Sequence, residues 1–290
     1  MKRREALKHS LLGGAGMGAM GVLAAAAGGL VSSAQAQGAP ATSTLDKVKQ
    51  TKELRIAAFP GEEPYFHKDI VSNAWSGACV SMAKDIAANF GATVIEVEST
   101  YGNSILDLQS GKVDIAFALN PTPARALSID FTTPILVHSF TVIGRKGLPT
   151  VANWQDINKP DIRVAVDLGT THETIARRYL PKTQITGFKT RDQALLALQS
   201  GRADYVVVLS LLAISALKKN PGLGVLSIPR PELSLPTNMG IRIEADHRWR
   251  DFLSVWADYN RSLGTMRQWV IEALGQMNIQ PDDIPPQIHF

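Results

Sequence analysis

The sequence predicts an α/β fold in two lobes, each a sheet flanked by helices. Strand and helix patterns alternate along most of the chain, which is typical of α/β domains. In addition, one seven-residue pattern occurs twice, ninety residues apart. Hydrophobic residues make up 45% of the chain and charged residues 19%, which excludes a disordered protein and provides for one large or two small cores.

The N-terminus is typical of an export signal. Residues 1–36 contain an Arg-Arg-x-x-Leu-Lys run, an apolar stretch over 11–31 and a small-x-small end at Ala36. A translocon and a signal peptidase recognise these features, and the basic run resembles a twin-arginine signal. We expect cleavage after Ala36 and a short polar leader over 37–44. The alternative is a retained membrane anchor, for which the Gly-rich stretch is only weakly apolar.

The positive charge of the chain belongs chiefly to this signal. The whole chain has 30 basic and 26 acidic residues, and the first 36 residues hold four of the basic ones and one of the acidic ones. The remainder therefore carries 26 basic and 25 acidic side chains, a net charge of +1. It has no basic stripe with interleaved aromatic residues, so we expect no nucleic-acid partner. Cys79 stands alone, which excludes an internal disulfide and a Cys-based metal site.

The first part of the mature chain alternates between strands and helices. Strands are expected over 54–59, 93–97 and 113–119, and helices over 80–90 and 105–110. In the first of these helices, Met82, Ile86 and Phe90 are four residues apart and share one face, and Gly91 follows as a stop.

The same order returns in the second part. Strands are expected over 164–168, 185–188 and 205–209, and helices over 171–180 and 191–200. The segment from 247 to 274 carries aromatic and aliphatic residues at helical spacing, so we expect two core helices separated at 262–264.

The repeated pattern joins a helix to a strand. Residues 108–114 read Leu-Gln-Ser-Gly-Lys-Val-Asp, and residues 198–204 read Leu-Gln-Ser-Gly-Arg-Ala-Asp. In each copy the helix ends at a glycine, which adopts positive φ without Cβ strain, and a buried strand follows. The repeat predicts two lobes of similar architecture, the alternative being convergent use of a good helix cap.

Several short motifs follow one another in a specific order. They are Glu53-Leu54-Arg55-Ile56-Ala57, residues 108–114, Thr122-Pro123-Ala124-Arg125, Ile129 to Pro134, Gly169-Thr170-Thr171, residues 201–204 and Ser262-Leu263-Gly264-Thr265. In this order and spacing the chain resembles the bacterial extracellular solute-binding proteins of family 3, which have the type II periplasmic binding protein fold and feed amino-acid ABC importers. The resemblance covers nearly the whole mature chain.

The resemblance implies two lobes joined by two hinge crossovers. Lobe 1 would comprise residues 45–142 and 238–290, and lobe 2 residues 143–237. The lobes would close on a ligand in the cleft between them. It also implies a monomer in the periplasm whose partners are a small carboxylate ligand and the membrane subunits of an ABC importer.

Arg125 is the strongest candidate for binding the ligand. A guanidinium forms bidentate hydrogen bonds with a carboxylate, and Arg125 follows Thr-Pro at the start of a helix, where its backbone is held. From the other lobe, Thr170 and Thr171 begin a helix whose free N–H groups form an anion site, a role that is compatible with simple helix capping. The loop after the first-lobe strand adds Ala118, Asn120 and Thr122 as further ligand-binding candidates.

Other positions depart from the amino-acid-binding pattern. The acidic residue that the family uses for the ligand's α-ammonium falls at Leu209, with Ser210 as a polar neighbour and further candidate. The family's aromatic platform falls at Glu62, so that Glu62 and Glu63 form an unexpected carboxylate pair at the mouth of the cleft. These two either bind a cationic group or are solvated turn residues.

Three aromatic residues are candidates to replace the missing platform, with core packing as the alternative: Phe59, Tyr65 and Trp75. The expected ligand is therefore a small carboxylate-bearing solute, an amino acid or a related polar compound, that the usual α-amino clamp does not hold.

We expect no catalytic residues, cofactor or metal. Walker-type, Gly-x-Ser-x-Gly and His-Glu-x-x-His motifs are absent, and the histidines have no metal-ligand spacing. His172 is set apart because it follows the Thr-Thr anion site and would add a pH-dependent donor. Two other functions stay open: a dehydratase-like lyase acting on a cyclic carboxylate, as in a few relatives of this fold, and a sensor or accessory protein that uses the tail over 279–290 to contact a partner.

Overall fold

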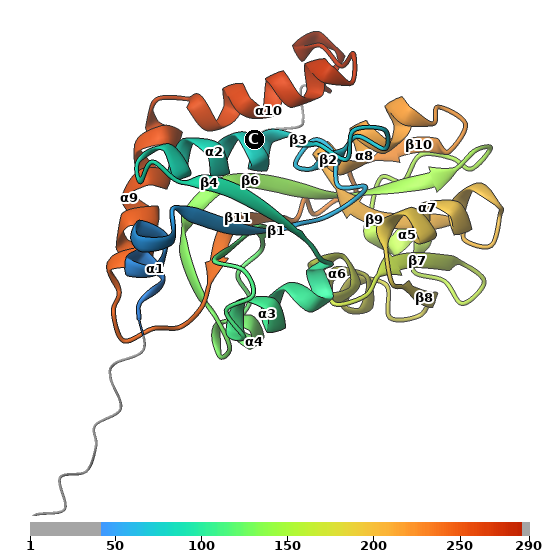
Figure 1. Ribbon diagram of the computed structural model, residues 1–290. Coiled ribbons are helices and arrows are strands. Elements are labelled where there is room, and N and C mark those ends of the chain that lie inside the picture. Colours follow the sequence, from blue (N-terminus) through green and yellow to red (C-terminus); the bar gives the residue numbers. More distant parts are fainter. Residues whose placement is uncertain (1–41, 286–290) are drawn as a thin grey trace, which may run out of the picture. The chain divides into compact units, whose positions relative to one another are not determined.

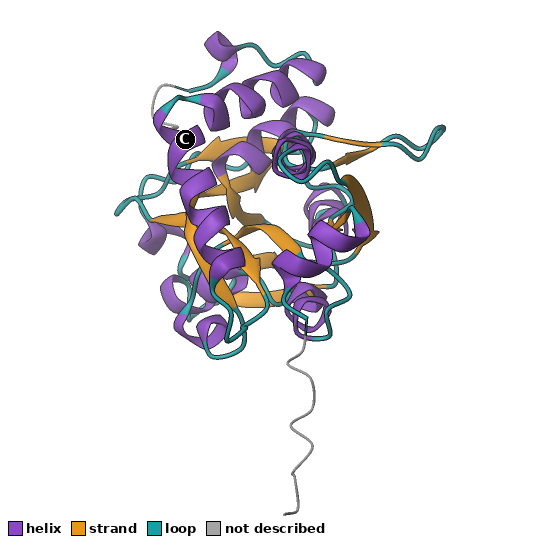
Figure 2. Ribbon diagram, turned by 60° about the vertical axis from the view of Figure 1, so that its left-hand side comes forward, coloured by secondary structure: helices purple, strands orange, loops and turns teal. Residues whose placement is uncertain are grey.

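The structure is a computed structural model that describes residues 42–285. The predicted signal segment, its cleavage site and the last five residues of the tail lie outside the described residues. Within 42–285, nine strands form one mixed sheet in the order β4-β1-β5-β11-β6-β9-β7-β8, and β10 also pairs with β6. Helices lie on both sides of these strands (Figures 1 and 2). The predicted α/β class is confirmed.

We call the elements from α1 to α4, together with α9 and α10, the first half. Its elements are α1 (Thr44–Thr51), β1 (Glu53–Ala58), β2 (His67–Lys68), β3 (Trp75–Ser76), α2 (Ala78–Ala88), β4 (Thr93–Glu98), α3 (Tyr101–Gln109), β5 (Ile115–Leu119), α4 (Pro123–Ala126), α9 (Arg248–Ser262) and α10 (Thr265–Gln276). Strands β4, β1 and β5 are parallel. Helices α2 and α3 lie on opposite sides of these strands (Figure 1).

The second half contains the elements from α5 to β10. They are α5 (Trp154–Ile157), β7 (Arg163–Asp167), α6 (Thr171–Tyr179), β8 (Gln184–Phe188), α7 (Arg191–Gln199), β9 (Tyr205–Leu209), α8 (Ser210–Lys219) and β10 (Gly224–Ser227). Strand β7 pairs in parallel with β8 and β9. Each half therefore has a parallel core, and the carboxyl ends of parallel strands are where ligands bind in open α/β sheets.

Two long strands belong to both halves. Strand β6 (Asp130–Arg145) pairs with β11 (Ser234–Ile241) along its first part and with β9 and β10 along its last part. The segments expected as hinge crossovers, 137–142 and 237–241, lie within these two strands. The lobe boundaries and the hinge motion stay predictions.

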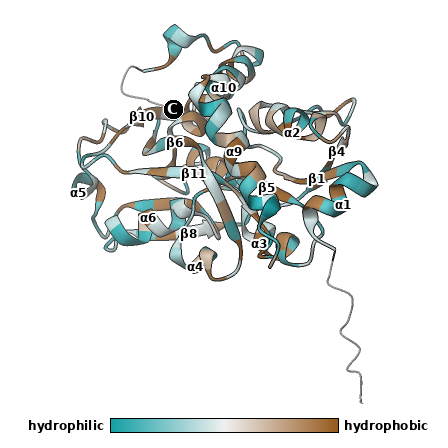
Figure 3. Cartoon of the chain, turned by 90° about the vertical axis from the view of Figure 1, so that its left-hand side faces the viewer, coloured by the Kyte–Doolittle hydropathy of each residue, from teal (hydrophilic) through white to brown (hydrophobic). Residues whose placement is uncertain are grey.

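Burial follows the sequence patterns. The strands β5 and β9 are buried along their whole length, as continuous apolar runs require. The helices α1 and α6 are largely polar, which Figure 3 shows as teal, and they bury one face only. The predicted break between the last two helices is confirmed, because Gly264 adopts φ 76° between α9 and α10. Strands and helices therefore follow the predicted order with bounds shifted by a few residues.

The repeated sequence forms a repeated structure. Asp114 accepts hydrogen bonds from the backbone N–H of Arg55 at 2.9 Å and from its guanidinium at 3.1 Å. Asp204 does the same with Arg163, at 3.0 and 2.7 Å. Each aspartate ties the turn after a helix to the first strand of its own half, so the repeat is more than a shared helix cap.

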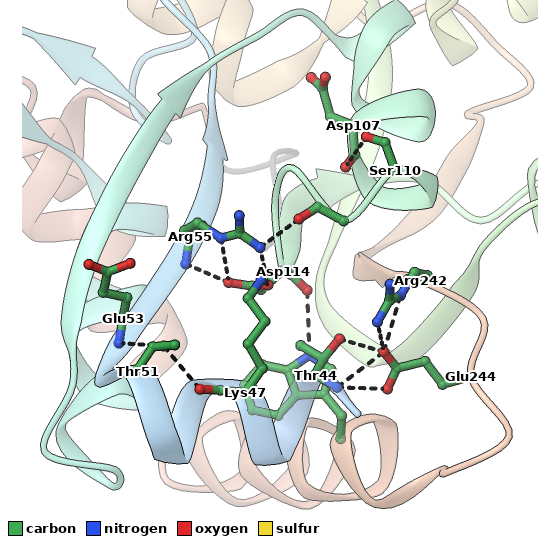
Figure 4. Close-up of polar contacts among 12 residues, drawn as sticks. Thr44, Lys47, Thr51, Glu53, Arg55, Asp107, Ser110, Asp114, Arg242 and Glu244 are labelled. Carbon is green, nitrogen blue, oxygen red and sulfur yellow. Dashed lines mark hydrogen bonds and ion pairs between the residues drawn. The ribbon is translucent and has the colours of Figure 1, made fainter. Parts of the chain in front are cut away.

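The first copy also holds the N-terminal helix. The Lys47 ammonium on α1 lies 2.6 Å from the Asp114 carboxylate, and the Thr44 hydroxyl donates to Glu244 at 2.6 Å (Figure 4). Glu244 in turn accepts from Arg242. These charged contacts fix α1, which the sequence analysis did not predict, against the first half.

The C-terminal tail is partly folded. After α10, Ile279 is buried and a short 3-10 helix covers Pro281–Asp283. Ile284 packs against the core. The part of the tail within the described residues therefore contacts the protein itself.

Candidate functional site

Two adjoining cavities lie where the first and second halves meet. The inner cavity has a volume of about 20 Å³ and the outer cavity about 320 Å³, and both are lined by Tyr101 and Thr170. The inner cavity is also lined by five of the predicted residues, namely Tyr65, Ala118, Asn120, Arg125 and Thr171. The outer cavity is lined by Phe59, Glu62, Asp167 and Arg191, among others. Residues that were predicted from positions up to 112 apart in the sequence therefore line this pair of cavities, and their binding role stays a prediction.

Arg125 links the two halves at the inner cavity. The Thr122 hydroxyl caps α4 by accepting from the Arg125 N–H at 3.2 Å, which fixes the start of the side chain. The guanidinium donates to the carbonyls of Asn120 and Gly169, both at 2.9 Å. Burial lowers the pKa of this guanidinium from its usual value, although arginine stays charged. Among residues 42–285, no carboxylate forms an ion pair with it.

Asn120 and Thr171 form a second link between the halves. The Thr171 hydroxyl donates to Asn120 Oδ1 at 2.6 Å, and Asn120 Nδ2 donates to the carbonyl of Pro236 at 2.9 Å. Ala118 adopts φ 59°, an uncommon conformation for a residue with a Cβ. The backbone is thus strained at the end of β5 that leads into the site. Strained backbone positions cluster at functional sites.

The inner cavity contains no acidic residue among its lining. Leu209 lies in its wall, as the register from the resemblance predicted, and Leu212 adds a second apolar side chain. Tyr65 is buried, and its hydroxyl lies 2.8 Å from Nε2 of His138 on β6. Burial lowers the pKa of His138 to about 3, so this imidazole is neutral.

A buried charged cluster connects the two cavities. Arg191 donates through Nε to Glu62 Oε1 at 3.1 Å and through Nη2 to Asp167 Oδ2 at 2.5 Å. Arg191 is 4% exposed, and Asp167 5%. Burial works against ionisation of Asp167, but the charge of Arg191 and the hydrogen bonds to the carboxylate together lower its pKa below the usual value. Glu62, by contrast, has its pKa raised to about 8, chiefly by burial, with Asp167 adding repulsion.

His172 belongs to the same cluster and has both ring nitrogens engaged. Nδ1 lies 3.1 Å from the Asp167 carboxylate, and Nε2 accepts from the backbone N–H of Leu209 at 3.2 Å. Nδ1 therefore carries the proton, and Nε2 has no hydrogen to donate. Burial lowers the pKa of His172 below its usual value. The prediction that His172 supplies a pH-dependent donor is wrong, because its imidazole is held in one neutral tautomer.

The two glutamates differ from the expected pair at the mouth. Both are buried, so neither is a solvated turn residue. Glu62 lines the outer cavity, whereas Glu63 pairs with Lys219 at 2.6 Å and His67 at 3.1 Å at a separate cavity of about 190 Å³. Glu62 and Glu63 do not form a joint site, because the two side chains line different cavities.

Other candidates have local roles in the structure. Thr122 caps α4, and Ser210 is fully buried at the start of α8; neither lines the two cavities. Trp75 packs at a right angle on Phe66 in the small β2-β3 hairpin, away from both cavities. The anion site at α6 is smaller than expected, because the Gly169 N–H donates to the Glu173 carboxylate at 2.9 Å.

Sequence reasoning missed Tyr101, Asp167 and Arg191. A signal for Asp167 was present, since it lies near the carboxyl end of the strand predicted over 164–168, where ligands bind in such sheets. Arg191 opens a predicted helix and Tyr101 lies before one, and nothing in their spacing distinguishes them from ordinary surface residues.

Within the described part of the chain, no helix is long and apolar enough to cross a membrane. The same residues contain no group of three or more His, Cys, Asp or Glu side chains that could hold a metal ion.

Comparison with known proteins gives a consistent result. The family model for bacterial extracellular solute-binding proteins, family 3, matches residues 54–278. A protein of Campylobacter jejuni named "Probable histidine-binding protein" is 27% identical over 179 residues, which is 61% of this chain and 68% of the relative. The cyclohexadienyl dehydratase of Pseudomonas aeruginosa is 22% identical, over 78% of this chain and 84% of the relative.

A solved structure is similar in both fold and sequence. It is described as an ancestral amino acid-binding protein, a precursor of cyclohexadienyl dehydratase. It is 30% identical, with a TM-score of 0.71, and the match covers 79% of this chain and all of that structure.

Proposed function

The chain belongs to the bacterial extracellular solute-binding proteins of family 3, and from this premise we propose that it captures a small carboxylate-bearing solute between its two halves for an ABC importer. The solute is an amino acid or a related polar compound. This class is supported by two similar proteins, one named as a probable histidine-binding protein and one described as an ancestral amino acid-binding protein.

The observation that carries the proposal is the unpaired guanidinium of Arg125. It is partly buried and donates only to two carbonyls, with no carboxylate at ion-pair distance among residues 42–285. Buried charges are normally paired, because an isolated charge loses several kcal/mol of hydration. A ligand carboxylate supplies the missing charge and accepts two parallel hydrogen bonds from the planar group.

Thr171 and the first turn of α6 face the same cavity from the second half. The ligand carboxylate would accept from N–H groups of that turn, and from the Thr171 hydroxyl once its hydrogen bond to Asn120 is broken. Since the inner cavity of about 20 Å³ is close to the space that one water needs, a solute enters only when the halves separate. We propose that they move about β6 and β11 and close on the ligand.

Location and partners follow from the family and remain part of the proposal. The signal-like segment over 1–36 directs the chain to the periplasm, where it binds its solute as a monomer and delivers it to the membrane subunits of the importer.

The test is isothermal titration calorimetry against a panel of small carboxylates and their uncharged amides, with Arg125→Ala as the variant. We expect loss of carboxylate binding by a factor of at least 100, equivalent to about 3 kcal/mol. Arg177→Ala, an exposed arginine on α6, is the matched control and should bind as the parent does. Binding that Arg125→Ala leaves unchanged would refute the proposed carboxylate site.

A second candidate function is dehydration of a cyclic carboxylate, as in the Pseudomonas aeruginosa relative. One observation favours it: Glu62, at the wall of the outer cavity, holds a proton near neutral pH because its pKa is raised to about 8. A protonated carboxyl is able to protonate a leaving hydroxyl, which then departs as water. Turnover of a prephenate-like acid, followed by absorbance, would establish this activity, and stoichiometric capture without product would exclude it.

A further inference from the structure

Two consecutive glutamates of the first half each pair with a basic residue of the second half. Glu62 accepts from Nε of Arg191, at the start of α7, at 3.1 Å. Glu63 lies 2.6 Å from the ammonium of Lys219, in the last turn of α8. The first pair lines the outer cavity, whereas Glu63 lines neither of the two site cavities. The second pair therefore joins the halves at a position outside the candidate site.

The turn that carries Glu63 is anchored in the first half. Pro64, the next residue, accepts through its carbonyl from the backbone N–H of Ala78 at 3.0 Å, and Ala78 is the first residue of α2. Lys219, by contrast, belongs to α8, which packs against β9 and β10 of the second half. When the halves separate, the carboxylate stays with α2 and the ammonium moves with α8. Separation therefore requires the ion pair to break.

Glu63 is a buried and charged member of this pair. It is 7% exposed, and its Oε1 also lies 3.1 Å from Nδ1 of His67. Burial works against ionisation, but the hydrogen bonds from Lys219 and His67 lower the pKa of Glu63 below its usual value. Hydrogen bonds between two charged groups are stronger than neutral ones. Breaking this contact therefore opposes the opening of the halves.

The contact at Glu63 differs from those at the inner cavity, because a bound solute does not compete for it. The Arg125 guanidinium and the Thr171 hydroxyl also join the halves, through Gly169 and Asn120. Both are donors that the ligand carboxylate would use. The ion pair of Glu63, outside the cavities, remains in place whatever solute they contain. Its contribution to closing is thus independent of the chemistry of the solute.

We propose that Glu63 and Lys219 form a latch that holds the two halves closed and prolongs the lifetime of the bound solute. The inference rests on the proposed function, because it assumes that the halves separate when a solute leaves. The latch stabilises the closed arrangement by the same factor for every solute, so it slows release without selecting among solutes. Glu63 and Lys219 are positioning residues, which act on binding through the arrangement of the halves.

The experiment measures the distance between the halves in the ligand-free protein. Spin labels are attached at two exposed positions, Leu106→Cys on α3 and Leu196→Cys on α7, while Cys79 is fully buried. Double electron–electron resonance then gives the distribution of label distances. Lys219→Gln should shift this distribution toward longer distances and lower the ratio of closed to open molecules about fivefold. The factor is moderate because the Lys219 side chain is 48% exposed, so water screens part of its charge.

Lys112→Gln is the matched control. Lys112 is also half exposed and pairs with a buried carboxylate, that of Asp107 at 3.1 Å, but both residues belong to the first half. This variant should keep the parent distribution of distances. Glu63→Gln should open the halves as Lys219→Gln does. The double variant should add little to either single change, because both remove the same contact.

The rate of release provides a second readout. For each carboxylate of the calorimetric panel that binds the parent, stopped-flow displacement should show release about fivefold faster from Lys219→Gln, by a similar factor for all of them. Identical distance distributions in the parent and Lys219→Gln, equal opening in Lys112→Gln, or release at the parent rate would overturn the inference. If no carboxylate of the panel binds, the proposed function fails, whereas the distances in the ligand-free protein still decide whether the latch exists.

Discussion

Acidification should destabilise the protein through one buried histidine on β6. His138 is fully buried, its Nε2 lies 2.8 Å from the Tyr65 hydroxyl, and its Nδ1 has no partner among the described residues. Burial lowers its pKa to about 3, against about 6.5 in an unfolded chain. Because the folded pKa is depressed, the unfolded chain takes up a proton below pH 6.5 that the folded chain refuses until pH 3. Between pH 7 and pH 5 this difference removes about 2 kcal/mol of stability.

The assay is urea denaturation at pH 7 and pH 5. His138→Gln retains a hydrogen-bonding side chain but cannot titrate, so its loss of stability over this interval should be smaller than that of the parent by about 2 kcal/mol. His247→Gln, an exposed histidine before α9, should lose as much as the parent. Equal losses for His138→Gln and the parent would refute the reasoning. An NMR titration of the His138 ring in the parent protein gives an independent check, since it should show no protonation down to pH 5.

Three further substitutions test other parts of the structure. Leu209→Asp places a carboxylate where the family holds the α-ammonium of its ligand. Calorimetry should then show that α-amino acids gain at least tenfold in affinity relative to their des-amino analogues, and an unchanged ratio would show that Leu209 does not occupy the family's acidic position. Asp114→Ala should lower the free energy of unfolding in urea by about 3 kcal/mol and Asp204→Ala by about 2, because the Asp114 carboxylate is the more buried of the two. A larger loss for Asp204→Ala would contradict this ranking. Gly224→Ala should lower the free energy of unfolding by about 2 kcal/mol or more in the same assay, because φ of Gly224 is 147° and an added Cβ would clash with the Gly144 carbonyl oxygen. Stability equal to that of the parent would exclude this clash.

Local sequence patterns predicted most of the fold. The repeated helix-to-strand units around Asp114 and Asp204 were recognisable because glycine caps and buried strands leave a strong local signal. The predicted order of strands and helices is confirmed. Helix α8 was missed since it follows β9 without a turn residue, so one apolar run covers both elements.

The candidate site was only partly predictable. Arg125, Asn120 and Thr171 follow motifs whose local geometry is regular, and they line the same cavity. The cluster of Glu62 and Arg191 was not foreseen, because the pair joins residues 129 positions apart and forms only when the two halves meet. Long-range charge pairing leaves no trace in local spacing.

The most direct test of the central claim is native mass spectrometry of the protein purified under gentle conditions, with the released solute identified by its fragments. The account predicts one small carboxylate-bearing solute at a stoichiometry of one per chain, retained by the parent and by Arg177→Ala but lost from Arg125→Ala. A retained solute without a carboxylate, or the same solute at equal occupancy in Arg125→Ala, would contradict it.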